Sequence, residues 1–469
     1  MMSTNPAPRR RRWLWRLLGV LATVGALWLL WTIGEGEWLR WEGNRELAAA
    51  IAETNQSDPT WRLDDLNAER NRLPEGKNGA ELVPRIKRLC PKDWGPVSLD
   101  IDWEAIGKAP TNTRIPKEAI EETRRQCAAA KAAIELARTC KDYPLGFRTL
   151  QIKTHMIDTL LPDTQDTRLV ANLIKSQIII DIENGDFTRI ADSLHAMLNL
   201  SRSVGNNTNI LMQFVRVACR AITTRSLEWV LAQGELPPEG VAALQALWAN
   251  DAEEPVLLNG LRGERAILNA LVENFANGTT SIQDMQDYKD LGQHFSSLQW
   301  WHYRRTLLPG DHARILSGFL PLVALACKPI DEQVQQVATF RDPKFDSDHL
   351  LFRVLFPTVT KFAELSWQSV AEMRCTIAAL ACERYRQKRG RWPASLAELV
   401  PEYLPAIPLD PFDSQPLRLK RLPDGIVVYS IGLNRNDDGG SLKRPDNPNG
   451  TDDGFRLWDV TQRRKPAPR

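Results

Sequence analysis

The longest apolar stretch of the chain lies near its start, and no charged residue interrupts it from Leu17 to Ile33. A helix from Trp13 to Ile33 would be about 31 Å long, which matches the thickness of a bilayer core. The sequence therefore predicts a transmembrane helix over residues 13–33, with membrane lipid as its surroundings. Tryptophans cluster at both ends of this stretch, where indole rings favour the headgroup zone.

The flanking charges predict the orientation of this helix. A basic tail, residues 1–12, precedes it and carries four consecutive arginines, whereas mixed charges follow it from Glu35 to Glu42. Because positive charge stays on the cytoplasmic side, we expect a cytoplasmic N-terminus and an extracytoplasmic main body, in a bacterial inner membrane. The alternative is a cleaved signal peptide, but the apolar run is long and no small-x-small site follows it.

Beyond the membrane, the pattern predicts a protein that is mainly helical. Residues 34–115 are rich in proline and glycine, which indicates an irregular juxtamembrane collar. Over residues 116–365 apolar positions recur with helical spacing; Val170, Leu173 and Ile174 are one such group. Turn residues separate these stripes about every 35 to 45 residues. This spacing agrees with an irregular helical bundle and equally with an array of helical hairpins.

Residues 277–311 break this regularity, which predicts a long surface loop or a lid. Within them, Trp300 to Arg305 mixes aromatic and cationic side chains that could plug the helical body, lie on lipid or stack on a ligand. Upstream, Glu264 and Arg265 interrupt an apolar stripe. These charges either pair with a neighbouring helix or line a pocket.

The pattern changes again in residues 366–459. Apolar positions predict an amphipathic helix from Ser369 to Arg389, with Gly390 after its end and Ser395 as the cap of a second short helix. Residues 417–422 and 426–431 alternate as strands do, and the Pro-Asp-Gly turn between them predicts a β-hairpin. This part therefore reads as a small α+β module.

Five short motifs of this module occur in an order that resembles one known family. They are Tyr385, Gly390–Pro393, Ile407–Phe412, Tyr429–Gly432 and Asp437–Gly440. In this order they resemble the globular part of the major pseudopilin of type II secretion systems, over residues 370–459. In that family the membrane helix directly precedes the globular part, whereas here the helical region intervenes. The resemblance therefore implies a docking or structural unit rather than a pilus subunit.

The same resemblance implies a metal. In the pseudopilin family the acidic loop binds calcium, an ion that takes several oxygen ligands. The residues that match this loop are Asn434, Asn436, Asp437, Asp438 and, beyond an insertion, Asp452 and Asp453. Of these, the resemblance implies Asp437, Asp438 and Asp453 as the calcium ligands. The alternative is a solvated loop whose residues simply favour turns. Residues 460–469 form a basic, proline-rich tail that we expect to be disordered.

Composition narrows the functional classes only slightly. The net charge is +2, so charge gives no reason to expect a nucleic-acid partner. The seven cysteines contain no CxxC pair and read as small buried residues, with one tertiary disulfide as the alternative. The sequence has no Gly-x-Ser-x-Gly, no His-Glu-x-x-His, no Walker loop and no dinucleotide fingerprint.

These patterns predict a mainly α-helical protein with an N-terminal transmembrane helix, a helical domain and a pseudopilin-like α+β module. The function we expect is a non-enzymatic, single-pass envelope protein that presents this module to another envelope protein. The alternative is a ligand-binding or enzymatic helical domain, with a pocket near Glu264, Arg265 and Trp300 to Arg305.

Overall fold

The computed structural model describes residues 9–69, 73–95, 103–150, 164–280, 296–336 and 358–466. Contacts divide these residues into two compact units, which are treated separately below. The first contains residues 9–59, 271–280 and 296–318. The second contains residues 60–69, 73–95, 103–150, 164–270, 319–336 and 358–466. The boundaries of these units differ from the domain boundaries predicted from the sequence, which lie after residues 115 and 365.

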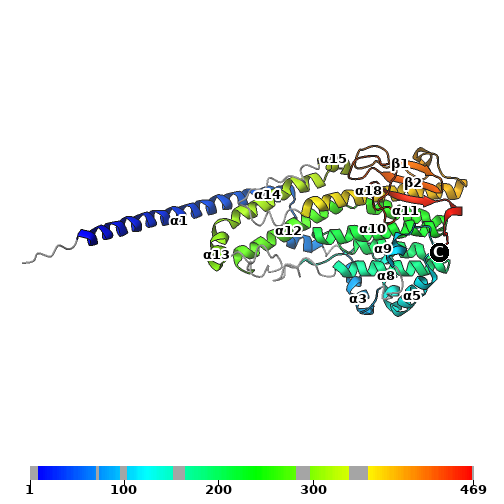
Figure 1. Ribbon diagram of the computed structural model, residues 1–469, viewed down its shortest axis with the longest axis horizontal. Helices are drawn as coiled ribbons and strands as arrows, with labels where there is room; N and C mark the ends of the chain where they lie inside the picture. The colour runs from blue at the N-terminus through cyan, green and yellow to red at the C-terminus, as the bar shows by residue number, and fades with distance from the viewer. Residues whose placement is uncertain are drawn as a thin grey trace, which may run out of the picture. The chain divides into compact units, whose positions relative to one another are not determined.

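The first unit is built on α1, one uninterrupted helix of 49 residues, Arg9–Ser57 (Figure 1). The helix is long and apolar enough to cross a membrane, and its apolar window has no buried residues in the structure. Residues 34–57, after the apolar run, continue α1 without a break. The helix ends just before Asp58 and Pro59, where proline disfavours a further helical turn, and the N–H of Asp58 donates to Thr54 O at 2.9 Å.

Two further helices pack on α1 within this unit. Helix α13, Ser297–Thr306, starts with a capping box in which Ser296 and Gln299 each accept a backbone N–H. Helix α14, Leu308–Ala326, begins two residues later; its residues up to Gly318 belong to this unit, and the remainder belongs to the second unit. Residues 297–306 and 308–311 are therefore helical rather than a loop, because the capping box and the aromatic contacts of α13 stabilise a turn-rich sequence. Residues 281–295 lie outside the described residues.

A glycine allows α1 to approach α14 closely. A Cβ atom on Gly43 would lie only 2.7 Å from the backbone nitrogen of Gly310 and 3.2 Å from Cβ of Pro309. Any side chain at residue 43 would therefore force the two helices apart. This role of Gly43 could not be predicted from the local pattern, in which Gly43 is an ordinary helix residue.

The second unit contains most of the helices and all described strands. Its elements are α2 Leu63–Ala68, η2 Gly79–Glu81, α3 Leu82–Leu89, α4 Trp103–Lys108, α5 Lys117–Ala129, α6 Lys131–Arg138, η3 Thr139–Asp142, α8 Thr164–Glu183, α9 Phe187–Arg202, α10 Ile210–Gln233, α11 Pro238–Ala252, most of α12 Val256–Asn277, α15 Ile330–Gln335, α18 Thr358–Arg389, η5 Leu396–Leu399, β1 Arg418–Leu422, β2 Gly425–Ser430, β3 Asp453–Trp458 and η6 Val460–Gln462.

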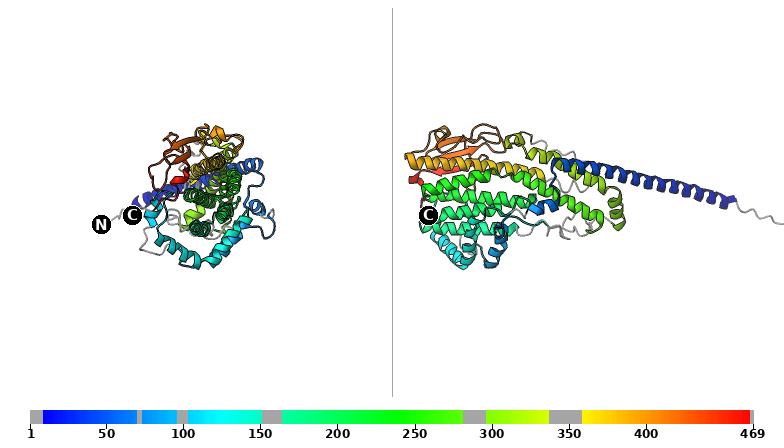
Figure 2. Two further views of the ribbon diagram at one scale, coloured as in Figure 1. Left: turned by 90° about the vertical axis from the view of Figure 1, so that its right-hand side faces the viewer. Right: turned by 180° about the vertical axis from the view of Figure 1, so that it is seen from behind.

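The long helices of this unit lie side by side around one core (Figure 2). The predicted apolar stripe of α8 is confirmed, since Val170, Leu173 and Ile174 are fully buried. Helix α18 packs against α10 and α11, far earlier in the chain. In a hairpin array each repeat contacts its neighbours in sequence, so these long-range contacts favour the irregular bundle.

Segments of the expected collar are fixed to the bundle by asparagine side chains. Asn78 donates to Phe147 O at 2.9 Å and accepts the Phe147 N–H at 2.8 Å. Asn67 forms the same pair of hydrogen bonds with Leu150. These amides pair with an extended backbone as a neighbouring strand would, and thereby satisfy its polar groups.

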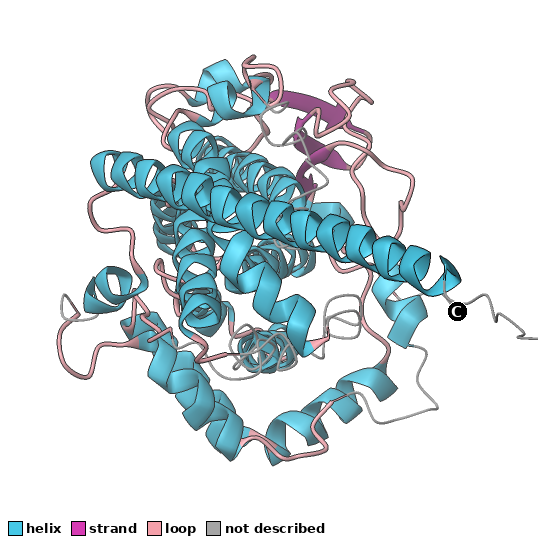
Figure 3. Cartoon of the chain, turned by 90° about the vertical axis from the view of Figure 1, so that its left-hand side faces the viewer, coloured by secondary structure: helices cyan, strands magenta, loops and turns pink. Residues whose placement is uncertain are grey.

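A three-stranded antiparallel sheet in the order β1-β2-β3, magenta in Figure 3, packs on α18 through β2 and β3. The predicted hairpin is confirmed, with Leu422 paired to Gly425 at its turn. Strand β3 was not predicted, because the acidic, glycine-rich residues before it look like a loop. Ser395 makes no capping hydrogen bond, and Glu398 instead accepts the N–H of Ala394 at 2.7 Å.

The disorder expected from residue 460 is wrong as far as residue 466. The guanidinium of Arg463 is buried and lies 3.0 Å from Glu383 Oε2. Arg464 Nη2 lies 2.9 Å from Glu183 Oε2. Glu383 is itself fully buried on α18. The tail is ordered because its arginines are counter-ions to carboxylates of the bundle.

Candidate functional site: a groove along α18

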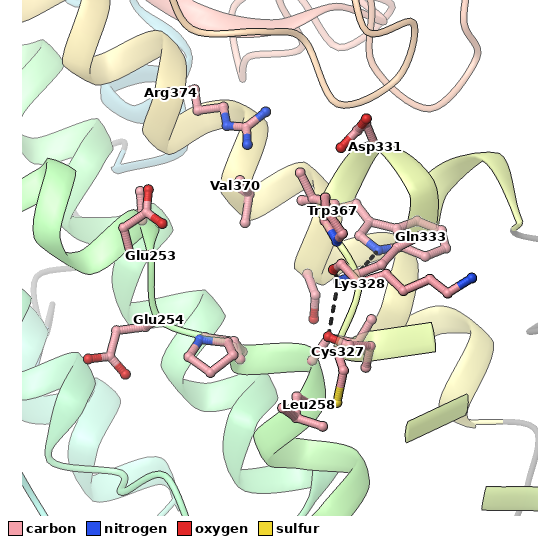
Figure 4. Close-up of a pocket in the computed structure, with 18 residues that line it drawn as sticks. Glu253, Glu254, Leu258, Cys327, Lys328, Asp331, Gln333, Trp367, Val370 and Arg374 are labelled. Carbon is pink, nitrogen blue, oxygen red and sulfur yellow. Dashed lines mark hydrogen bonds between the residues drawn. The ribbon is translucent and has the colours of Figure 1, made fainter. Parts of the chain in front are cut away.

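A groove of about 380 Å³ lies on the second unit, beside the first half of α18 (Figure 4). Its walls come from the turn between α11 and α12, the turn between α14 and α15, and residues 366–374 of α18. A second cavity of about 270 Å³ shares Glu253, Asp331 and Arg374 with it and extends to Leu409. The two together form one elongated groove.

Gln333 builds one wall of the groove. Its amide nitrogen donates to Lys328 O at 2.7 Å and Ala326 O at 3.2 Å, and its amide oxygen accepts the indole N–H of Trp367 at 3.1 Å. These bonds join the end of α14 to α18, as the dashed lines of Figure 4 show. Prolines shape the other turns: Pro255 precedes α12, and Pro329 precedes α15 at a fixed φ of −52°.

Two polar groups of α18 are available to an occupant. The hydroxyl of Ser366, a residue only 4% exposed, has no hydrogen-bond partner among the described residues. The guanidinium of Arg374 donates to Leu409 O at 2.7 Å. Burial lowers the pKa of Arg374, while the nearby Glu253 and Asp331 act in the opposite direction. An unsatisfied buried hydroxyl costs free energy unless an occupant provides a partner.

This arrangement suits a short peptide segment. Trp367 and Val370 provide an apolar floor, and Ser366 and Arg374 can hydrogen bond to backbone carbonyls. Glu253 and Asp331 lie at the shared part of the groove, where a basic side chain would be attracted.

The carboxylates predicted to bind calcium are engaged separately. Asp437 Oδ2 lies 3.1 Å from Arg418 Nε, and its other oxygen accepts the Gly439 N–H at 2.9 Å. Asp438 accepts hydrogen bonds from Asn434 and Thr451. Asp453, on β3, is 8% exposed and accepts from Gln368 at 3.4 Å.

The fit to calcium is therefore poor in this arrangement. Among the described residues no three acidic, histidine or cysteine side chains are grouped as metal ligands. A guanidinium beside Asp437 also neutralises charge that a cation would need. Calcium binding stays a prediction of the resemblance. Titration calorimetry of the whole protein with calcium tests it: binding heat at millimolar ion would support the prediction, and the absence of heat would contradict it.

The residues of the alternative pocket divide between the two units. In the second unit, Glu264 accepts the Ile210 N–H at 3.1 Å, and burial raises its pKa to about 7. Arg265 is fully buried, with its guanidinium 5.5 Å from the ring centre of Trp61. In the first unit, Trp300 packs edge-on against Phe275 with ring centres 5.5 Å apart. Trp300 thus fills the interior of the first unit, whereas the next residue, Trp301, is exposed.

Sequence reasoning missed a cluster of buried charges in the second unit. Asp251 is fully buried, and Arg202 Nε and Arg220 Nε lie 2.6 and 2.7 Å from its two oxygens. Arg216 lies 3.8 Å from Asp251 and 3.4 Å from Glu254. Burial opposes the charge of Asp251, but attraction to the three arginines outweighs it and holds the pKa below its usual value. The sequence signal for this cluster was the spacing of Arg216 and Arg220, which lie four residues apart on the otherwise apolar helix α10.

A second missed pair lies where α18 meets β3. Burial raises the pKa of Asp453 to about 7, and the neighbouring Glu372 carboxylate adds to this shift. Burial likewise raises the pKa of Glu372. Arg444 lies close enough to oppose both shifts, while it also pairs with Glu228 at 3.1 Å. These carboxyl groups keep protons at a pH where exposed ones do not.

No protein-family model, curated protein or solved structure matches this chain.

Proposed function

We propose that this protein is a single-pass, membrane-anchored envelope protein that docks a partner protein on its extracytoplasmic helical body. The observation that carries the proposal is α1. Its apolar residues are exposed along the whole span, although more than 400 residues are available to bury them. An apolar surface of this extent in water is very unfavourable, and a bilayer removes the cost.

The charge pattern supports the orientation within this proposal. The arginines before the span lie on the cytoplasmic side, so everything after Ile33 lies outside the cytoplasm. Helix α1 continues for 24 residues beyond Ile33, which is about 36 Å, and it packs on α13 there. The anchor and the first unit are thereby joined by a helix rather than by a flexible linker.

The groove along α18 supports the docking role. It is elongated, it combines an apolar floor with charges of both signs, and it ends at the Pro408–Leu409 segment of the α+β part. The occupant we propose is a peptide segment of another envelope protein, with a basic side chain between Glu253 and Asp331. The α+β part borders the groove, so a pseudopilin-like module would form part of the same docking surface.

Cys327 provides a direct test. All seven cysteines are free, and Cys327 alone is exposed, at the edge of the groove. A thiol-specific photo-crosslinker on Cys327 should capture one defined protein in intact membranes. Val370→Trp, which fills the groove, should abolish the crosslink, whereas Val460→Trp on the exposed η6 should not. Crosslinks to lipid alone, or a product unaffected by Val370→Trp, would remove the docking role.

A second function is favoured by one observation, the unsatisfied hydroxyl of Ser366. A small ligand with a polar group and an apolar part would use the same groove, as a membrane-tethered ligand-binding or enzymatic domain. Ser366→Ala distinguishes the two occupants. The affinity for a peptide with many contacts should fall by less than about threefold. The affinity for a small ligand that depends on this hydroxyl should fall by about tenfold.

A further inference from the structure

Helix α13 meets α1 just beyond the apolar span. Arg305 Nη2 lies 2.6 Å from Glu37 Oε1, and a Cβ atom on Gly36 would lie 3.2 Å from Thr306 Cγ2. Gly36 follows Ile33 by three residues, which is about 4.5 Å along a helix axis. The contact between the two helices therefore lies within one helical turn of the end of the span.

The two faces of α13 differ sharply. Trp300 and Tyr303 are buried, and their rings stack with centres 5.6 Å apart. On the other face Leu298 is 73% exposed and Trp301 is 51% exposed. Residues three and four apart share one side of a helix, so Leu298, Trp301 and Arg305 form a continuous exposed stripe. We call this stripe the α13 outer face.

Arg305 connects the α13 outer face to the level of the membrane. Its guanidinium lies 5.8 Å from the ring centre of Trp301 while it pairs with Glu37. The indole is thus held beside α1 just past the span. Each headgroup zone of a bilayer is about 5–8 Å thick, from the difference between total and core thickness. At that depth an amphipathic indole is favoured and a guanidinium can reach phosphates.

An exposed tryptophan of α1 lies at the same level. Trp38 is 55% exposed and follows Ile33 by five residues, which is about 7.5 Å along a helix axis. Exposed apolar and aromatic side chains from two helices therefore gather in one narrow layer next to the span. Large apolar side chains exposed together mark an interaction surface rather than chance exposure.

We propose that α13 is an interfacial helix whose outer face inserts Leu298 and Trp301 into the bilayer surface beside the anchor. The occupant of this face is lipid of the outer leaflet, and the inference rests on the proposed membrane anchoring. The consequence is mechanical. One spanning helix can rotate and tilt freely, whereas a second contact at the surface fixes the orientation of the first unit on the membrane.

Depth-dependent quenching tests this proposal in the full chain. The protein is placed in nanodiscs of phosphatidylethanolamine and phosphatidylglycerol that contain lipid with a nitroxide on its acyl chain. A fluorophore is attached to Leu298→Cys in a Cys327→Ser background, since Cys327 is the exposed native thiol. Leu27→Cys, in the span, reports on the anchor itself. Glu53→Cys, exposed on α1 and 20 residues past Ile33, is the matched control.

We expect quenching of about twofold or more at residues 27 and 298, and none at residue 53. Quenching at residue 27 without quenching at residue 298 would overturn the interfacial role of α13 and leave the anchor intact. Absence of quenching at residue 27 would instead overturn the anchoring on which both depend. Quenching at all three positions would show that the surface contact is not specific to α13.

Discussion

The two longest helices of this protein, α1 with 49 residues and α18 with 32, use their apolar residues in opposite ways. In α1 the apolar span is uninterrupted and fully exposed. In α18 charged residues interrupt the apolar stripe, yet Met373, Leu380 and even Glu383 are buried. Charges inside a helix therefore do not prevent burial when distant segments supply counter-ions. A helix without charges can remain exposed when its solvent is lipid.

The largest expected effect concerns α1. The double variant Leu21→Arg/Leu27→Arg places two charges inside the span, at a cost of about 2.5–3.5 kcal/mol each in helix insertion. The protein should move from the membrane fraction to the soluble fraction or be lost. Glu46→Arg/Glu53→Arg, beyond the span, should leave the distribution unchanged. An unchanged membrane fraction for the first variant would break the contrast between α1 and α18.

The next effect concerns the buried charges that support the bundle around α18. Asp251→Ala leaves Arg202 and Arg220 without their carboxylate, which should destabilise the second unit by about 3–5 kcal/mol. Chemical denaturation monitored by circular dichroism measures this loss. Asp192 is exposed and pairs with Lys141, so Asp192→Ala should cost less than about 1 kcal/mol. Equal costs for both variants would contradict the role of Asp251.

A smaller effect depends on pH at the contact of α18 with β3. Asp453 has a folded-state pKa of about 7, above its value in the unfolded chain. The folded protein therefore holds this proton after the unfolded chain has lost it, and stability should fall as pH rises from about 4 to about 7. The loss between about pH 5 and pH 7.5 should be about 2–3 kcal/mol.

Asp453→Asn keeps the shape and removes the titration, so this part of the pH dependence should disappear. Stability curves in denaturant at several pH values measure it. A wild-type protein whose stability rises over this range would contradict the burial of a protonated Asp453.

The smallest effect concerns the packing of α1 after the span. A side chain on Gly43 meets the backbone of Gly310, so Gly43→Ala should destabilise the first unit by about 1–3 kcal/mol. Gly34 has open space around its Cβ position, and Gly34→Ala should be neutral or slightly stabilising. Thermal unfolding in nanodiscs compares the two. If Gly43→Ala and Gly34→Ala both left the unfolding temperature unchanged or raised it, a close contact at Gly43 would be contradicted.

Local sequence patterns predicted the elements that depend on local chemistry. The apolar run of α1 and the Pro-Asp-Gly turn between β1 and β2 are signals carried by neighbouring residues. The groove, the Asp251 cluster and the ordered Arg463 depend on residues brought together from distant positions. No periodicity reveals such pairs. The capping box of Ser296 and Gln299 is a local signal for α13. The irregular apolar pattern of residues 277–311 nevertheless led to the prediction of a loop.

The most direct test of the central claim, an extracytoplasmic body held by one spanning helix, uses the exposed Cys327. A membrane-impermeant maleimide is added to intact spheroplasts and, separately, to lysed ones. We predict that Cys327 is labelled without lysis and that Cys327→Ser removes the label. In that Cys327→Ser background, a cysteine introduced by Ser3→Cys should be labelled only after lysis. Labelling of Cys327 only after lysis would place the body in the cytoplasm and contradict the account.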